Sequence, residues 1–266
     1  VISSYGLMMV IAFLFGNYLL RKDMERLDRD PLLADDLTFQ AALGGILGAK
    51  IYYIIENIPS GRATDNIAGL GDIFTGIFTL NGSLIASGIQ NFGSGLVFYG
   101  GLIGGFFSVT LYIYIKKLSW LEYADIVAPL LALGHSIGRL GCFLVHDCDG
   151  VESKYNFFPL AVKFPDMHVH LYPTQIYEML AYLAIFLYLY SYRHRVNFKG
   201  ELFFEYLFLV GISRFLIEFI RSHEYLNTNG EWVESFNMFG LYGAQHISLI
   251  MIIAGIGFHY YLRLKK

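Results

Sequence analysis

Long apolar segments separated by short polar ones run along almost the whole chain. Seven of them are long enough to cross a hydrocarbon layer of about 30 Å, which needs about 20 residues of helix. They lie at approximately 3–20, 37–57, 95–115, 123–145, 174–192, 201–221 and 240–262. The pattern predicts an all-α, polytopic membrane protein with seven transmembrane helices, built as a single integral membrane domain over residues 1–266.

The composition supports a membrane protein, because 55% of the 266 residues are hydrophobic and only 15% are charged. The net charge of −3 carries no signal of nucleic-acid binding, so we expect no nucleic-acid partner. The first apolar segment has no basic region before it and no small-residue cleavage site after it. We therefore expect this segment to be a membrane span rather than a cleaved targeting signal.

Lysines and arginines are unevenly distributed between alternate loops. Twelve of them lie in four segments, 21–35, 116–117, 193–199 and 263–266. The opposite loops hold three, which are Arg62, Lys154 and Lys163. Because basic loops tend to stay in the cytoplasm, we expect the N-terminus outside and the C-terminus inside.

This orientation predicts on which side of the membrane three connecting regions lie. The mixed-charge run RKDMERLDRD at 21–30 is expected to be a solvated cytoplasmic loop. Residues at about 58–93 and 146–173 are expected to form insertions at the outer face. The first of these is glycine-rich with short apolar pieces, which is consistent with a segment lying on the membrane.

Arginines within or at the ends of the predicted spans indicate a functional site near the outer surface. Each costs about 2.5 to 3.5 kcal/mol at a helix centre, so such residues face protein or a polar cavity. Arg214, Glu218 and Arg221 are four and three residues apart and would share one helix face. Together with Arg139 they leave an excess of positive charge, which suits the phosphate of a lipid headgroup. For Arg221 alone, the alternative is a side chain that extends to the membrane surface.

The stretch GRLGCFLVHDCDG at 138–150 concentrates polar side chains at the end of the fourth span. Cys142, His146 and Cys148 lack an established zinc-ligand spacing, so we expect no metal. A disulfide between the two cysteines is one alternative on an oxidising face. Unpaired cysteines packed near the site are the other alternative, and the one that we favour.

Glycines recur at helix-packing intervals in two apolar segments. GGILG at 44–48 and YGGLIGG at 99–105 both place small residues four positions apart. Close packing of helices in lipid is sufficient to explain most of these glycines.

Taken in order, a set of short motifs resembles one family, the prolipoprotein diacylglyceryl transferases of bacterial inner membranes. The motifs are YGLMM at 5–9, LGAKIYY at 47–53, YGGLIGG at 99–105, GRLGCF at 138–143, FPLAVKFP at 158–165, YPTQIYE at 172–178, SRFLIEFIR at 213–221 and GAQHIS at 243–248. They extend over nearly the whole chain. The family's seven-span topology with an outer N-terminus is also the one expected here.

The resemblance implies that the chain transfers the diacylglyceryl group of phosphatidylglycerol to the thiol of a lipobox cysteine in a prolipoprotein signal peptide. A thioether forms and glycerol phosphate is released. It also implies a multi-pass protein of the bacterial cytoplasmic (inner) membrane, in contact with membrane lipid and without a cofactor.

The same resemblance assigns roles to individual residues. Arg139 and Arg214 match the phosphate-handling arginines, Glu178 and Gln175 match an acidic motif, and Gly150 matches the glycine that closes a signature loop. The predicted catalytic residues are Arg139, Arg214, Tyr99, Glu178 and Asp147. The predicted substrate-binding residues are Tyr5, Gly100, Gly101, Gly104, Cys142, Gly150, Gln175, Glu218 and Arg221.

Three positions depart from the family pattern. Tyr99 and Tyr172 stand where the family tends to have histidine, and Cys142 stands where it usually has asparagine. A histidine with a pKa of about 6.5 accepts a thiol proton at neutral pH, whereas an ordinary tyrosine with a pKa of about 10 is rarely ionised. The proton acceptor is then Asp147, Glu178, His146 or a perturbed Tyr99. The chain is either a divergent transferase or a paralogue that binds or translocates phospholipid without this transfer.

Overall fold

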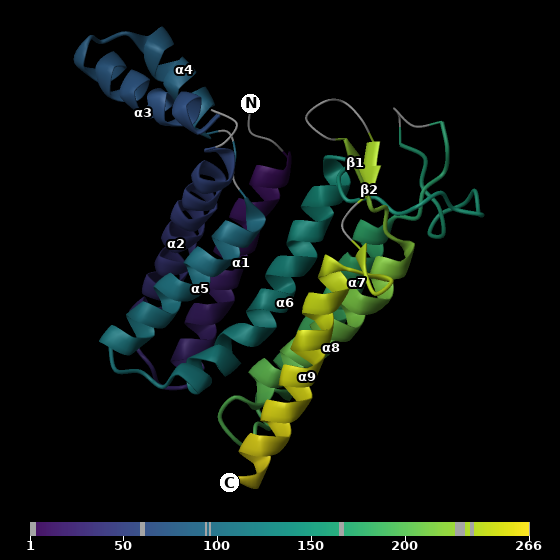
Figure 1. The fold of residues 1–266 in the computed structure, drawn as a ribbon. Helices are drawn as coiled ribbons and strands as arrows, with labels where there is room; N and C mark the ends of the chain where they lie inside the picture. Colours follow the sequence, from purple (N-terminus) through teal and green to yellow (C-terminus); the bar gives the residue numbers. More distant parts are fainter. Residues whose placement is uncertain are drawn as a thin grey trace. The chain divides into compact units, whose positions relative to one another are not determined.

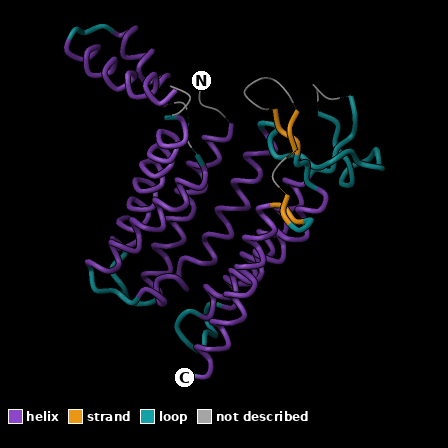
Figure 2. Tube along the Cα trace, viewed as in Figure 1, coloured by secondary structure: helices purple, strands orange, loops and turns teal. Residues whose placement is uncertain are grey.

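The computed structural model describes the residue ranges 4–58, 62–93, 95, 97–164, 168–226, 232–234 and 237–265. Helices make up most of the structure, with four short strands near one another (Figure 2). The chain forms two compact units, the first from Val1–Asp28 and Leu121–Lys266 and the second from Arg29–Trp120.

The described part of the second unit folds into four helices, which can be followed by their labels in Figure 1. They are α2 (Leu32–Asn57), α3 (Arg62–Phe78), α4 (Gly82–Gly93) and α5 (Phe98–Ile115). Helices α2 and α5 pack so closely that a Cβ added to Gly48 would lie 2.7 Å from Cα of Gly104, and the converse distance is also 2.7 Å. This contact explains the spaced glycines of the sequence, because only residues without a Cβ fit there.

Helices α3 and α4 form an antiparallel pair in the region expected to be an outer-face insertion. Asn66 Nδ2 donates to the backbone oxygen of Asn91 at 2.8 Å and fastens the pair. Part of the predicted insertion, residues 59–61, lies outside the described residues, as do 165–167 of the second predicted insertion.

The first unit contains the remaining five α-helices of the described chain and all four of its strands. They are α1 (Ser4–Arg26), α6 (Trp120–Leu144), α7 (Thr174–Tyr192), α8 (Glu201–Ile217), the 3-10 turn η1 (Glu218–Ile220), β1 (Glu224–Leu226), β2 (Trp232–Glu234), β3 (Asn237–Met238), β4 (Leu241–Tyr242) and α9 (Gly243–Leu264). Strand β1 pairs with β2 and β3 with β4, both antiparallel. Helices α8 and α9 lie side by side, and their Phe204 and Phe258 rings stack with centroids 5.1 Å apart (Figure 1).

Each of the seven predicted apolar segments is helical over most of its length. Within the described ranges, four helices are long and apolar enough to cross a membrane, namely α1, α2, α6 and α9. The protein is therefore mostly helical, with the character of an integral membrane protein.

Two details of the sequence interpretation are wrong. The run at 21–30 is not wholly a solvated loop, because α1 continues to Arg26 and buries Asp23, which forms ion pairs with Arg26 and Arg193. The helix expected over 201–221 ends earlier, at Ile217. Arg221 then has an extended backbone and lies beside Gly150, so it does not share a helix face with the residues before it.

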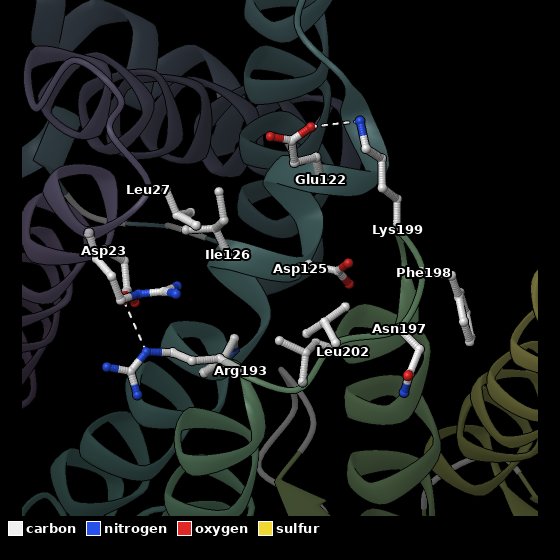
Figure 3. A pocket seen from close by; sticks show the side chains of 13 residues that line it. Asp23, Leu27, Glu122, Asp125, Ile126, Arg193, Asn197, Phe198, Lys199 and Leu202 are labelled. Carbon is white, nitrogen blue, oxygen red and sulfur yellow. Dashed lines mark hydrogen bonds and ion pairs between the residues drawn. The ribbon is translucent and has the colours of Figure 1, made fainter.

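A cavity of about 290 Å³ lies at the end of the first unit where α1 ends and α8 begins (Figure 3). The charged side chains around it are already paired. Arg193 Nε lies 3.0 Å from Asp23 Oδ1, and Lys199 Nζ lies 2.8 Å from Glu122 Oε2. Asp125 accepts the backbone N–H of Gly200 at 2.6 Å and so satisfies a donor at the start of α8. These interactions explain why charged residues line the cavity.

Candidate active site

Glu178 is the centre of a buried cluster of charges in the first unit. It lies in the first two turns of α7, and its side chain is completely buried. Nε of Arg139, on α6, lies 2.7 Å from Oε2 of Glu178. A terminal amino group of Arg214, on α8, donates to Oε1 of the same carboxylate. One carboxylate thus joins three helices, and these partners offset the high cost of burying its charge.

A second carboxylate extends this arginine–glutamate cluster past the end of α8. Arg214 Nη2 lies 2.8 Å from Oε2 of Glu218, which is also buried. Arg221 follows the 3-10 turn and places Nη1 3.9 Å from Oε2 of Glu178. The arginine side chains remain 15% to 21% exposed, whereas the two carboxylate side chains are at most 5% exposed. The arginine side chains are therefore more accessible than the two carboxylates.

The cluster of Arg139, Glu178, Arg214, Glu218 and Arg221 carries one more positive than negative formal charge. Nη1 of Arg221 is buried and has no hydrogen-bond acceptor among the described residues. Leaving such a buried donor unsatisfied costs about 1 to 3 kcal/mol, and more when it is charged. A single anionic acceptor, such as a phosphodiester with one negative charge, would neutralise the excess positive charge and accept a hydrogen bond from Arg221.

The loop after α6 is fastened to the start of α7. Gln175 is fully buried and donates through Nε2 to the backbone oxygen of Asp147 at 2.8 Å and to the carboxylate of Asp149. Thr174 Oγ1 donates to the backbone oxygen of Cys148 at 2.9 Å. The side chain of Asp147 is itself exposed, whereas partial burial raises the pKa of the Asp149 carboxyl group. The loop is therefore held mainly through its backbone.

Gly150 joins this loop to the segment that carries Arg221. Its N–H donates to the backbone oxygen of Tyr172 at 3.0 Å, and the residue forms an antiparallel bridge with Arg221. A Cβ at this position would lie 2.8 Å from the backbone oxygen of Ile220, which is closer than real Cβ atoms come. Only glycine fits without movement of the backbone, so Gly150 helps to position Arg221 in the cluster.

Cys142 and Cys148 are both free thiols, so the disulfide alternative is not the state found here. Helix α6 ends at Leu144, so the chain turns between the two cysteines. The neighbouring Cys142 thiol and the charge of Arg221 lower the pKa of the Cys148 thiol, whereas its burial opposes them.

The other predicted residues lie in two places. Tyr5 packs on Gly141 of α6, two positions after Arg139. Tyr99, Gly100, Gly101 and Gly104 belong to the second unit, and the last three face the backbone of α2. Their roles as substrate contacts stay predictions.

Two residues of the site were not among those predicted. Asp149 accepts the hydrogen bond of Gln175, and His223 lies against Glu218. Asp149 could have been predicted, because it lies in the polar run at 138–150. The only sequence signal for His223 was its position two residues after Arg221, because the fold of that segment depends on contacts distant in sequence.

These features define a class, a helical protein of membrane character with a buried cluster of arginines and glutamates. The chain matches the family model for prolipoprotein diacylglyceryl transferase over residues 1–261 and belongs to that family. This confirms the resemblance carried by its motifs.

Individual relatives extend over nearly the same length. The chain is 32% identical over 262 residues to the phosphatidylglycerol–prolipoprotein diacylglyceryl transferase of Clostridium tetani, covering 96% of this chain and 91% of the relative. The protein of the same name from Leptospira interrogans is 30% identical over 284 residues, with 96% and 87% covered. That from Staphylococcus aureus is 28% identical over 271 residues, with 98% and 85% covered.

Proposed function

We propose that this chain transfers the diacylglyceryl group of phosphatidylglycerol to the thiol of a lipobox cysteine in a prolipoprotein, and releases glycerol phosphate. The family membership and the names of the relatives support this activity. The structural observation that carries the proposal is the buried arginine–glutamate cluster, because its excess positive charge suits a lipid phosphodiester.

The chemistry is a displacement at the diacylglyceryl carbon that is bonded to a phosphate oxygen. The thiol gives up its proton to a base, its sulfur bonds to this carbon, the carbon–oxygen bond breaks, and the electron pair of that bond leaves with glycerol phosphate. Negative charge therefore accumulates on the phosphate in the transition state. Arg139 and Arg214 stabilise that charge, and Glu178 holds both guanidinium groups in place beforehand.

The remaining site residues have supporting roles in this proposal. Arg221 supplies a further donor to the phosphate, and Glu218 orients Arg214. Gln175 and Gly150 hold the loop that frames the site. Tyr5, Tyr99, Asp147, Cys142 and the glycines of α5 are proposed contacts of the lipid or the peptide.

We also propose seven membrane spans in a bacterial cytoplasmic membrane, with the N-terminus outside. The helical character of all seven apolar segments and the basic residues of alternate loops support this arrangement. The arginine–glutamate cluster then lies near the outer surface, where a signal peptide and the outer leaflet lipid are both available.

The test uses purified protein in vesicles with phosphatidylglycerol and a synthetic lipobox peptide. We expect the peptide mass to rise by one diacylglyceryl group, with an equal amount of glycerol phosphate released. A peptide with serine in place of the lipobox cysteine is the control and should remain unmodified. Lipid binding without either product would contradict the proposal and favour a lipid-binding or lipid-translocating protein.

A further inference from the structure

The proposed reaction needs a proton acceptor for the substrate thiol. The reactive species is the thiolate, and a free cysteine with a pKa of about 8.5 is mostly protonated at pH 7. A well-placed base typically contributes about 10²- to 10⁴-fold. The following inference rests on the proposed function, because it concerns the same reaction.

The acceptors expected from the sequence are poorly placed in the first unit. Glu178 is engaged by Arg139 and Arg214 and carries no exposed surface. The side chain of Asp147 points to solvent. His146 has left the helix and packs its ring on Phe164, with centroids 4.6 Å apart. A further histidine of this unit contacts the arginine–glutamate cluster.

His223 has that contact. Its Nε2 lies 3.0 Å from the backbone oxygen of Glu218, and its Nδ1 lies 3.7 Å from Oε1 of the Glu218 carboxylate. A carbonyl oxygen can only accept, so Nε2 carries the proton. In the neutral ring Nδ1 therefore holds a lone pair.

Contacts on two sides hold the ring. The Glu218 carboxylate lies on its Nδ1 side. The ring stacks on Tyr242 of β4 with centroids 3.4 Å apart, which fixes its plane. The His223 side chain is 13% exposed, so the ring is partly open to a substrate.

The same carboxylate connects His223 to the phosphate-handling groups. Oε1 of Glu218 faces His223, and Oε2 lies 2.8 Å from Nη2 of Arg214. The charged or titratable groups seen in contact with the ring are Glu218 of η1 and Tyr242 of β4. Arg214 reaches it through Glu218, and Arg221 precedes it by two residues in the chain. A base at this position would lie beside the phosphate that leaves.

We propose that His223 is the proton acceptor for the substrate thiol, and that Glu218 orients it. The S–H proton passes to Nδ1 as the sulfur bonds to the glyceryl carbon. The electron pair of the broken carbon–oxygen bond leaves with glycerol phosphate. The neutral Nε2–H tautomer is restored when the proton on Nδ1 returns to water.

The experiment compares wild type with His223→Gln in the vesicle assay at pH 7 and pH 9. Glutamine retains an N–H donor for the Glu218 carbonyl but cannot take up the proton. The control is His246→Gln, because Nδ1 of His246 lies 3.1 Å from the backbone oxygen of the same Tyr242. Rates of peptide lipidation and the KM for phosphatidylglycerol are measured for all three proteins.

We expect kcat of His223→Gln to fall about 100-fold at pH 7, with an unchanged KM for the lipid. The deficit should shrink at least about tenfold by pH 9, because the substrate thiol then ionises without help. Added imidazole should restore part of the activity of His223→Ala. His246→Gln should have the same kcat as wild type at both pH values.

Two results would overturn the assignment while leaving the transferase activity intact. One is an unchanged rate in His223→Gln. The other is a deficit of equal size at pH 7 and pH 9 without imidazole rescue, which would make His223 a structural link between η1 and β4. A wild-type protein that lipidates no peptide would instead refute the proposed function, and the assignment with it.

Discussion

Replacing Arg139 with lysine keeps the positive charge of the side chain but removes the planar shape of the guanidinium group. In the structure Nε of Arg139 lies 2.7 Å from Oε2 of Glu178, and the terminal amino groups are the remaining donors of the side chain. Lysine can reach the same carboxylate with its ammonium group and so preserve the ion pair. It cannot also present the planar, paired donors that match phosphate oxygens.

The expected loss follows from the number of contacts removed. One charge-assisted hydrogen bond contributes about 1.5 to 3 kcal/mol, and the 21% exposure of the Arg139 side chain favours the lower end. A loss of about 1.4 kcal/mol is tenfold in rate, so Arg139→Lys should transfer at least about tenfold more slowly. Since the contact strengthens as the phosphate departs, kcat and kcat/KM should fall together.

The assay measures initial rates of peptide lipidation in vesicles, with thermal unfolding to establish that each variant folds. Arg193→Lys is the matched control. Arg193 forms an equivalent pair, with Nε 3.0 Å from Asp23 and 16% of its side chain exposed, but it lies at the other end of the helices. It should stay within about twofold of wild type. A fully active Arg139→Lys, or equal losses in both variants, would refute the reasoning and leave Arg139 as a counter-charge in the bundle.

Three further outcomes test other parts of the account. Gly48→Leu should lower the stability measured by thermal unfolding by about 1 to 3 kcal/mol, because α5 leaves no room for a side chain at this position. Gly16→Leu is the control and should change the stability little, because no atom lies within 4 Å of a Cβ placed there. Alkylation of Cys148, followed by peptide mapping, should level off below about pH 8.5, because the pKa of this thiol is lowered from the value of about 8.5 for a free cysteine. A rate that still rises about tenfold per pH unit up to about pH 8.5 would contradict the lowered pKa. In a cysteine-free protein, Ser153→Cys should react with an impermeant reagent on intact cells and Lys22→Cys should not, and the reverse labelling would contradict the orientation.

The helices were predictable because membrane thickness sets a length that the apolar pattern records directly. The cluster of Arg139, Glu178 and Arg214 was also within reach of the sequence. Buried charges in apolar helices must find partners, and few other charges were available near the same helix ends. The sequence did not predict that both arginines would pair with the same carboxylate, that of Glu178.

The segment after α8 could not be predicted by periodicity. The spacing of Arg214, Glu218 and Arg221 suited a helix, yet the helix ends at Ile217. The backbone of Arg221 pairs with Gly150, which is distant in sequence, and such long-range pairing overrides local preference. The contact of His223 with Glu218 depends on the same departure from the helix.

The most direct test of the central claim is a structure of the wild-type protein with phosphatidylglycerol bound in a lipid nanodisc. We expect phosphate oxygens about 2.7 to 2.9 Å from terminal nitrogens of both Arg139 and Arg214. We also expect both arginines to retain their ion pairs with Glu178. A lipid phosphate bound away from these arginines, for example in the cavity beside Arg193, would contradict the claim that the arginine–glutamate cluster is the phosphate site.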